Sequence, residues 1–289
     1  MRLATPLGLV LALLISHSSL AQPLFATADS LEAAVSNADL VIVARITRLS
    51  DIEPPPDEPG HWVNLEIDEI LKMSLQEGPH EQLGMFLKRD LEELEHWIDE
   101  SAPLLIAYDN TQPYQAQVIT LEPDKVEVMN RDFEVLRDAE EVIRVARTTI
   151  RRTPRNVTRV ATFRLFVPRE RCLGTQWAWC LDTGGRMLLH VPADVHLEKK
   201  AIKMVESNDT FDRTIGISAL FYFESEENRE RMLSLLKDPG HYDDDPELGP
   251  DGFMRFRRRY VIRAQAYSVL RCWGLEVEQP VIEEFLKVE

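Results

Sequence analysis

The sequence predicts an α+β protein with an N-terminal antiparallel β barrel or sandwich, a central small β-segment and a C-terminal α-helical pack. Three observations support this fold class. Before residue 130, short segments alternate apolar and polar residues, which is the period of half-buried strands. Strand-like segments follow again after a proline at residue 154. From Asp194 onward, the apolar residues recur at helical spacing.

The composition limits the classes of function. The chain has 289 residues, 33 of them basic and 49 acidic, and its formal net charge is -16. A content of 44% hydrophobic residues is enough to bury a core. The strong negative charge disfavours nucleic acids and anionic membranes as partners. We therefore expect no specific nucleic-acid partner.

Residues 1–21 have the features of a signal peptide. Arg2 is the charged start, residues 7–15 are apolar, and Ser19-Leu20-Ala21 places small residues where a signal peptidase cleaves. The apolar run is shorter than the roughly 20 residues that span a membrane, although an uncleaved anchor is the alternative. We expect an exported protein, periplasmic or extracellular, with no membrane span in the mature chain.

The N-terminal β-domain is expected over residues 22–137. Asp29-Ser30-Leu31-Glu32 has the spacing of a capping box and predicts a helix to about Asn37. Val63, Leu65 and Ile67 alternate with polar residues, which predicts a half-buried strand. Further strands are expected at 40–46, 83–88, 104–108 and 115–120, with a helix at 91–98.

A central unit is expected over residues 138–193. Its helix, 138–152, carries an apolar stripe, and Pro154 ends it. The residues expected to face inward are Val142, Ile143, Ala146 and Ile150. Strands are expected at 161–167, 176–181 and 186–191, with turns at the intervening glycines.

The remaining residues, 194–289, are expected to form a helical domain. The periodicity stays helical to the end of the chain. Helices are expected at 195–206, 210–223, 226–237, 254–273 and 279–287.

The first domain resembles the OB-like barrel of the netrin and tissue-inhibitor type, as found in exported bacterial proteins. The resemblance rests on 38–46, 63–72 and 103–108, in that order. That inhibitor family chelates metal through a Cys-x-Cys amino terminus, whereas the mature chain here would begin Gln22-Pro23-Leu24. The resemblance therefore implies a fold, and no residue here carries the inhibitory mechanism.

Two segments of the last domain resemble HEAT-like repeats. Residues 233–239 look like the end of a first repeat helix, and 261–270 look like a second helix; a degenerate copy lies at 212–220. Small residues in such helices allow close approach of the pair. About two repeats imply a HEAT-like α-helical pack that caps the rest of the chain rather than a free solenoid.

The chain has three cysteines, Cys172, Cys180 and Cys272. In an oxidising compartment, Cys172 and Cys180 could form a disulfide across a short hairpin, although spacing alone does not supply the geometry. Cys272 lies in a helical segment and is expected to be a buried, unpaired side chain.

His190, Asp194 and His196 form the best cluster of metal-ligand types. Their spacing matches no fixed ligand motif, and the position of Asp194 is also typical of a helix N-cap. We therefore expect no metal and no other cofactor, and these three residues remain the metal candidate.

Arginine is concentrated in one region, because residues 144–171 hold nine arginines and one acid. One interpretation is internal neutralisation, which expects Arg144, Arg151, Arg258 and Arg259 near acids of other segments, and Arg263 paired as well. The alternative is an exposed patch for an anionic partner. The residues of that candidate patch are Arg147, Arg151, Arg152, Arg155 and Arg159.

No common nucleotide-binding or hydrolase motif occurs, and Gly216-Ile217-Ser218-Ala219-Leu220 lacks the second glycine of a nucleophile elbow. The sequence therefore favours an exported, non-catalytic binding or scaffold protein that engages another protein or an anionic polymer. The alternatives are a protease-inhibitor-like barrel and an enzyme whose site forms only in three dimensions.

Overall fold

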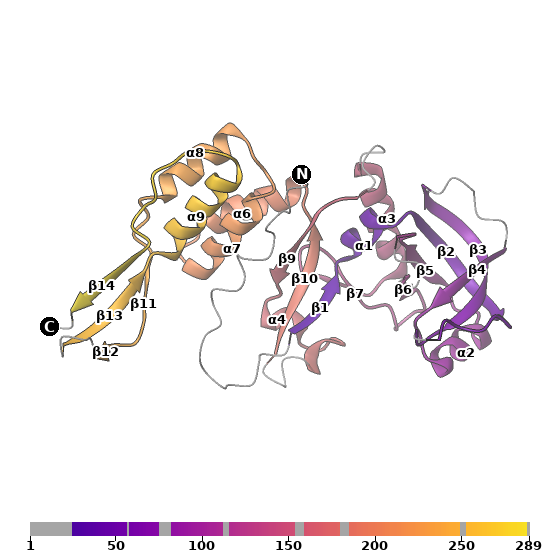
Figure 1. Cartoon of the computed structure of the whole chain (residues 1–289). Helices are drawn as coiled ribbons and strands as arrows, with labels where there is room; N and C mark the ends of the chain where they lie inside the picture. The colour runs from indigo at the N-terminus through magenta and orange to yellow at the C-terminus, as the bar shows by residue number, and fades with distance from the viewer. Residues whose placement is uncertain are drawn as a thin grey trace.

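The computed structural model describes residues 25–56, 58–74, 82–111, 116–153, 159–179, 185–248 and 253–287. The protein is mixed α/β. A curled half-barrel sheet, a three-stranded central sheet, a helical body and a small C-terminal sheet follow one another across the molecule (Figure 1). The expected signal peptide, 1–21, lies outside the described residues. Among the described residues, no helix has the length and apolar character needed to cross a membrane.

The half-barrel is a five-stranded antiparallel sheet in the order β4-β3-β2-β5-β6. Among the described strands, β4 and β6 form its two edges. The strands expected from sequence in this region are therefore confirmed. Their bounds are β2 (Leu40–Leu49), β3 (His61–Met73), β4 (Gln82–Leu87), β5 (Leu104–Tyr108) and β6 (Gln117–Thr120).

The first five residues of β2, Leu40–Ala44, are all apolar and buried because both faces of the sheet are covered there. Leu40 and Ile42 pack on one face, with side chains of α2 (Leu91–Asp99). Val41 and Val43 pack on the other, beneath α1 (Leu31–Asn37) and α3 (Ala139–Arg152). The near-continuous hydrophobic run thus reflects a two-sided core.

Helix α1 begins one residue later than the capping-box spacing suggests. Its N-cap is Ser30, whose Oγ accepts a hydrogen bond from the backbone N–H of Ala33 at 3.2 Å. Glu32 does not reach back to the cap; it is buried and pairs with Arg131. Arg131 follows β7 (Val128–Met129) and precedes β8 (Val135–Leu136), which form a small hairpin.

The central sheet joins the start of the described chain to its middle. Its order is β1 (Phe25–Asp29), β10 (Arg186–Pro192) and β9 (Thr162–Phe166), with β1 parallel and β9 antiparallel to β10. Strand β1 thus leaves the half-barrel, whereas α3 packs with α1 on the half-barrel core. The expected boundary between residues 137 and 138 therefore cuts through one hydrophobic core.

The expected strand at 176–181 is wrong for its described part, because residues 176–179 form turns and a short helical segment. The preceding residues form the short helix α4 (Arg169–Cys172). The hairpin that would have carried the disulfide is therefore absent from the described residues. Cys172 is buried at the end of α4, with its Sγ 3.8 Å from Met187 Sδ, and Cys180 lies outside the described residues.

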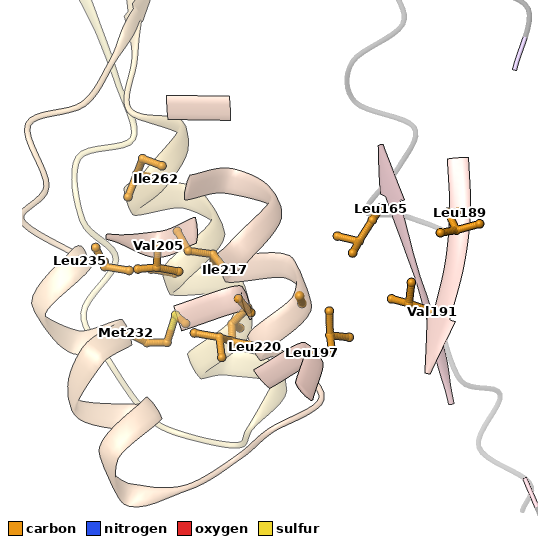
Figure 2. Packing of buried hydrophobic residues seen from close by; sticks show 14 of the residues in the cluster. Leu165, Leu189, Val191, Leu197, Val205, Ile217, Leu220, Met232, Leu235 and Ile262 are labelled. Carbon is orange, nitrogen blue, oxygen red and sulfur yellow. The ribbon is translucent and has the colours of Figure 1, made fainter. Parts of the chain in front are cut away.

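The helical body consists of α6 (Val195–Val205), α7 (Thr210–Leu220), α8 (Glu226–Leu235) and α9 (Val261–Cys272). Helix α7 packs against α6 and α9, and α8 packs against α9. The same core includes Leu165, Leu189 and Val191 of the central sheet (Figure 2). The helices thus cover one face of the central sheet.

The expected helices at 254–273 and 279–287 are wrong in part. Residues 254–259 form β13 (Met254–Arg259), and β14 (Glu283–Lys287) replaces the last helix. Strands β13 and β14 pair with each other. On its other side, β13 pairs with β11 (Tyr242–Asp243) and β12 (Glu247–Leu248). Acids from distant segments pair with the arginines of β13, and these ion pairs favour the strand. Local periodicity cannot predict such long-range pairs.

Cys272 is exposed, not buried, because it is the last residue of α9 and lies off the buried stripe of that helix. We predict that a maleimide reagent labels this thiol in the native protein. Cys272→Ser should remove that labelling, read by mass spectrometry of the corresponding peptide. A wild-type peptide that is labelled only after denaturation would contradict the exposed position.

Candidate functional site

A groove of about 1610 Å³ lies between the half-barrel, α1 and the central sheet. It exceeds the range of about 300–1,000 Å³ that small-molecule pockets occupy. Its walls include β1 on one side and β6 on the other, and its lining includes Ala33 and Ala34 of α1. The groove is thus bordered by the outermost strands of two different sheets.

Strand β6 presents its edge to the groove. All four residues, Gln117–Thr120, line it, although alternate side chains of a strand point to opposite faces. The backbone N–H of Leu121 donates to Pro103 O at 2.8 Å, so the odd-numbered residues here face β5. Val118 O accepts from Arg89 Nη2 at 3.3 Å, on the opposite side. The backbone groups of Val118 and Thr120 therefore point outward.

Strand β1 presents a second edge. Thr27, Ala28 and Asp29 line the groove in succession. The backbone N–H of Ser30 donates to His190 O at 2.9 Å, which assigns Ser30 and Ala28 to the side that faces β10. The backbone groups of Thr27 and Asp29 therefore point away from β10, and no other described strand pairs with them.

A series of hydrogen-bonded polar side chains links the two walls of the groove. Gln117 Nε2 donates to Asp29 Oδ2, and His190 Nδ1 lies 2.7 Å from Asp29 Oδ1. Arg164 Nε donates to His190 Nε2 at 2.9 Å. Because Nε2 accepts a hydrogen bond, the imidazole proton is on Nδ1, and this N–H donates a hydrogen bond to Asp29 Oδ1. Both ring nitrogens of His190 are thus occupied, so this histidine is poorly placed to act as a base or a metal ligand.

The charged side chains along the groove are paired with one another. Both Asp109 carboxylate oxygens lie 2.7 Å from Arg159 Nη2. Burial raises the pKa of Asp109, but hydrogen bonds from Thr111 and the interaction with Arg159 outweigh it and hold the pKa below 3.8. Further pairs are Lys88–Glu58, Arg89–Glu93 and Lys125–Glu122. The groove thus shows no dominant charge of either sign.

The three metal candidates do not converge. His190 is bound to Asp29 and Arg164, whereas His196 Nε2 lies 2.9 Å from Asp132 Oδ1. Asp194 is the N-cap of α6 and accepts from the backbone N–H groups of His196 and Leu197 at 3.0 and 3.2 Å. In the part of the chain that the structure describes, no group of three ligand-type side chains is arranged to hold a metal ion.

The five arginines of the candidate patch have different surroundings. Arg147 binds Glu69 with 2.7 Å contacts to both oxygens, and Arg159 binds Asp109. Arg151 donates Nε to Arg147 O at 3.2 Å, and both Arg151 and Arg152 are exposed. No described acid pairs with either of them. Arg155 lies outside the described residues.

The other arginines follow the neutralising interpretation in part. Arg258 and Arg259 pair with Asp243 and Asp244 at 2.8 and 2.7 Å, as expected. Arg144 pairs with Glu141 of its own helix instead of an acid from another segment. The expectation of an ion pair at Arg263 is wrong for the described residues. Its Nε donates to the backbone oxygen of Asp238 at 2.6 Å.

A buried ion network joins the half-barrel to the helical body. Arg131 Nε lies 3.3 Å from Glu32 Oε1, and Arg131 Nη1 lies 2.6 Å from Asp194 Oδ2. The side chains of Arg131 and Glu32 are 13% and 8% exposed. Burial raises the pKa of Glu32 above 4.5, and the attraction of Arg131 opposes that rise without cancelling it.

Sequence reasoning missed Gln117, Asp29 and Arg131 because their roles depend on partners far away in the chain. Period-2 alternation identifies a strand, but it does not identify which strand becomes an edge. Comparison of the chain with protein-family models, with curated proteins and with solved structures found no match.

Proposed function

We propose that this is an exported, non-catalytic binding protein that engages another protein through the groove between β1 and β6. The observation that carries the proposal is that two sheet edges with outward-pointing backbone groups border one groove. Such edges offer rows of hydrogen-bonding groups to a polypeptide. The OB-like and HEAT-like resemblances agree with a role in presenting surfaces.

A polypeptide suits the groove better than an anionic polymer does. Among the described residues of the candidate patch, Arg159 alone lines the groove. It is neutralised by Asp109, and Arg147 is neutralised by Glu69. An enzyme is less well supported, because the histidine in the groove is engaged on both ring nitrogens. A protease-inhibitor-like barrel would act through an exposed wedge that blocks a protease, and not through a groove.

A display library of random eight-residue peptides, panned against the purified protein, tests the proposal. Ala116 lines the groove just before β6, so Ala116→Trp should obstruct it and lower the retention of enriched peptides about tenfold or more. Leu233→Trp, at an exposed position of α8, is the matched control and should retain them. Failure to enrich any peptide, or equal retention by both variants, would contradict groove binding.

A further inference from the structure

We infer that the groove receives its partner as an added β-strand that pairs with the open edge of β6. This inference rests on the proposed function and specifies the mode of recognition. It concerns main-chain pairing, in which an extended segment extends an existing sheet.

The open edge of β6 has a defined pattern. Val118 and Thr120 both direct their backbone groups away from β5, two residues apart, which is the repeat of an antiparallel or parallel ladder. Val118 O is already held by Arg89. The remaining groups are the N–H of Val118 and the N–H and C=O of Thr120, and no described strand pairs with them. They supply two donors and one acceptor to an incoming strand.

The opposite wall provides a second row. Thr27 and Asp29 direct their backbone groups away from β10 and line the same groove. A strand that pairs on both sides needs about 9.6 Å between the edges, because neighbouring strands lie about 4.8 Å apart. The side chains of Gln117 and Asp29 meet between the two edges, so a strand that pairs on both sides has to displace this contact. Such a strand would connect the half-barrel sheet to the central sheet.

The side chains of the groove favour recognition that tolerates different sequences. Its cations are already paired with acids of the same chain, as shown by Lys88–Glu58, Lys125–Glu122 and Arg159–Asp109. Among the described lining residues, the Asp29 carboxylate contacts the neutral side chains of Gln117 and His190 and no cation, so a single acid remains to select among charged peptides. The binding free energy must then come mainly from main-chain hydrogen bonds and from burial of the peptide's apolar side chains.

The test uses an eight-residue peptide of alternating threonine and valine and two analogues that are N-methylated at every second residue, in either register. N-methylation removes the main-chain donors of one strand edge and leaves the side chains unchanged. Calorimetry on the full chain should show that at least one register weakens binding about tenfold, since several hydrogen bonds are lost together. Equal affinity of all three peptides would overturn strand addition.

A protein variant tests the same edge from the other side. Val118→Pro removes the outward N–H and spares the ladder to β5, since proline is tolerated on the open side of edge strands. It should weaken peptide binding about tenfold. Val118→Ala keeps the N–H and should bind within about threefold of wild type.

The possible failures are distinguishable. Peptide binding that Ala116→Trp abolishes, but that neither N-methylation nor Val118→Pro changes, would overturn strand addition and leave the proposed function standing. Absence of groove-dependent peptide binding would overturn both. Should Val118→Pro fail to fold, as judged by circular dichroism, the N-methylated peptides decide the question alone.

Discussion

Replacing Arg131 with methionine is expected to lower the free energy of unfolding by about 3–5 kcal/mol at pH 7. Arg131 bridges Glu32 of α1 and Asp194 at the start of α6. Its removal leaves the Glu32 carboxylate buried without its cationic partner, and an unpaired buried charge is costly. Urea denaturation followed by circular dichroism would measure the loss. Arg144→Met, which breaks the exposed pair with Glu141, is the control and should cost less than about 1 kcal/mol.

The pH dependence of this effect has a definite sign. Because the pKa of Glu32 is raised in the folded protein, the folded state binds its proton more tightly than the unfolded chain does. The contribution of Glu32 to stability is therefore greatest below pH 4.5 and decreases as the pH rises through the folded pKa. In Arg131→Met that decrease should be larger, since the opposing attraction is gone.

The deficit of Arg131→Met should thus shrink on acidification toward pH 4.5, where Glu32 takes up a proton. The double variant Arg131→Met, Glu32→Gln should recover a large part of the loss at pH 7, because no buried charge remains. A deficit that is the same at both pH values, and that Glu32→Gln does not relieve, would show that the network does not act through the Glu32 charge.

Gly216→Ala is expected to destabilise the helical body by about 1–3 kcal/mol, although alanine is the better helix former. A Cβ at this position would lie 2.7 Å from Ala201 O and 2.8 Å from Val205 N, both backbone atoms of α6. Neither atom can move without shifting the helix. Val205, Ile217 and Leu220 pack together where α6 and α7 meet (Figure 2), so a shift would open this core.

Thermal unfolding would measure this effect, with Gly84→Ala as the control. Gly84 lies in β4, and a Cβ there would meet no atom within 4 Å. Its substitution should leave the stability nearly unchanged. An increase in stability for Gly216→Ala would mean that α6 and α7 are not in such close contact, and that intrinsic helix propensity outweighs packing at this position.

The sequence predicted most elements of the half-barrel because their evidence is local. Period-2 alternation over Val63–Ile67 and the continuous apolar run at Leu40–Ala44 depend on residues adjacent in the chain. The helices α6 to α8 were predicted for the same reason, since an apolar stripe and an acidic or hydroxyl cap lie within a few turns.

The errors occurred where long-range partners override local preference. Residues 254–259 have a pattern compatible with a helix, but Asp243 and Asp244 pair with arginines on them and Glu283 lies opposite Arg259 in the ladder. Residues 254–259 meet these acids when they form a strand in the small C-terminal sheet. Because the acids are distant in the sequence, local periodicity does not reveal this pairing. Cys272 was expected to be buried because its neighbours are helical, yet its position relative to the buried stripe is set by packing of the whole helix.

The sequence by itself thus determined the mixed α/β class, the helices between residues 195 and 237 and the strands of the half-barrel. Tertiary structure alone decided that β1 pairs with β10, that Glu32 meets Arg131 and that β6 forms an open edge beside a groove. The physical reason is that side-chain periodicity records which face of an element is buried. Side-chain periodicity does not predict which backbone groups form hydrogen bonds with another strand. In this chain, the outward-pointing backbone groups of β1 and β6 line the candidate site.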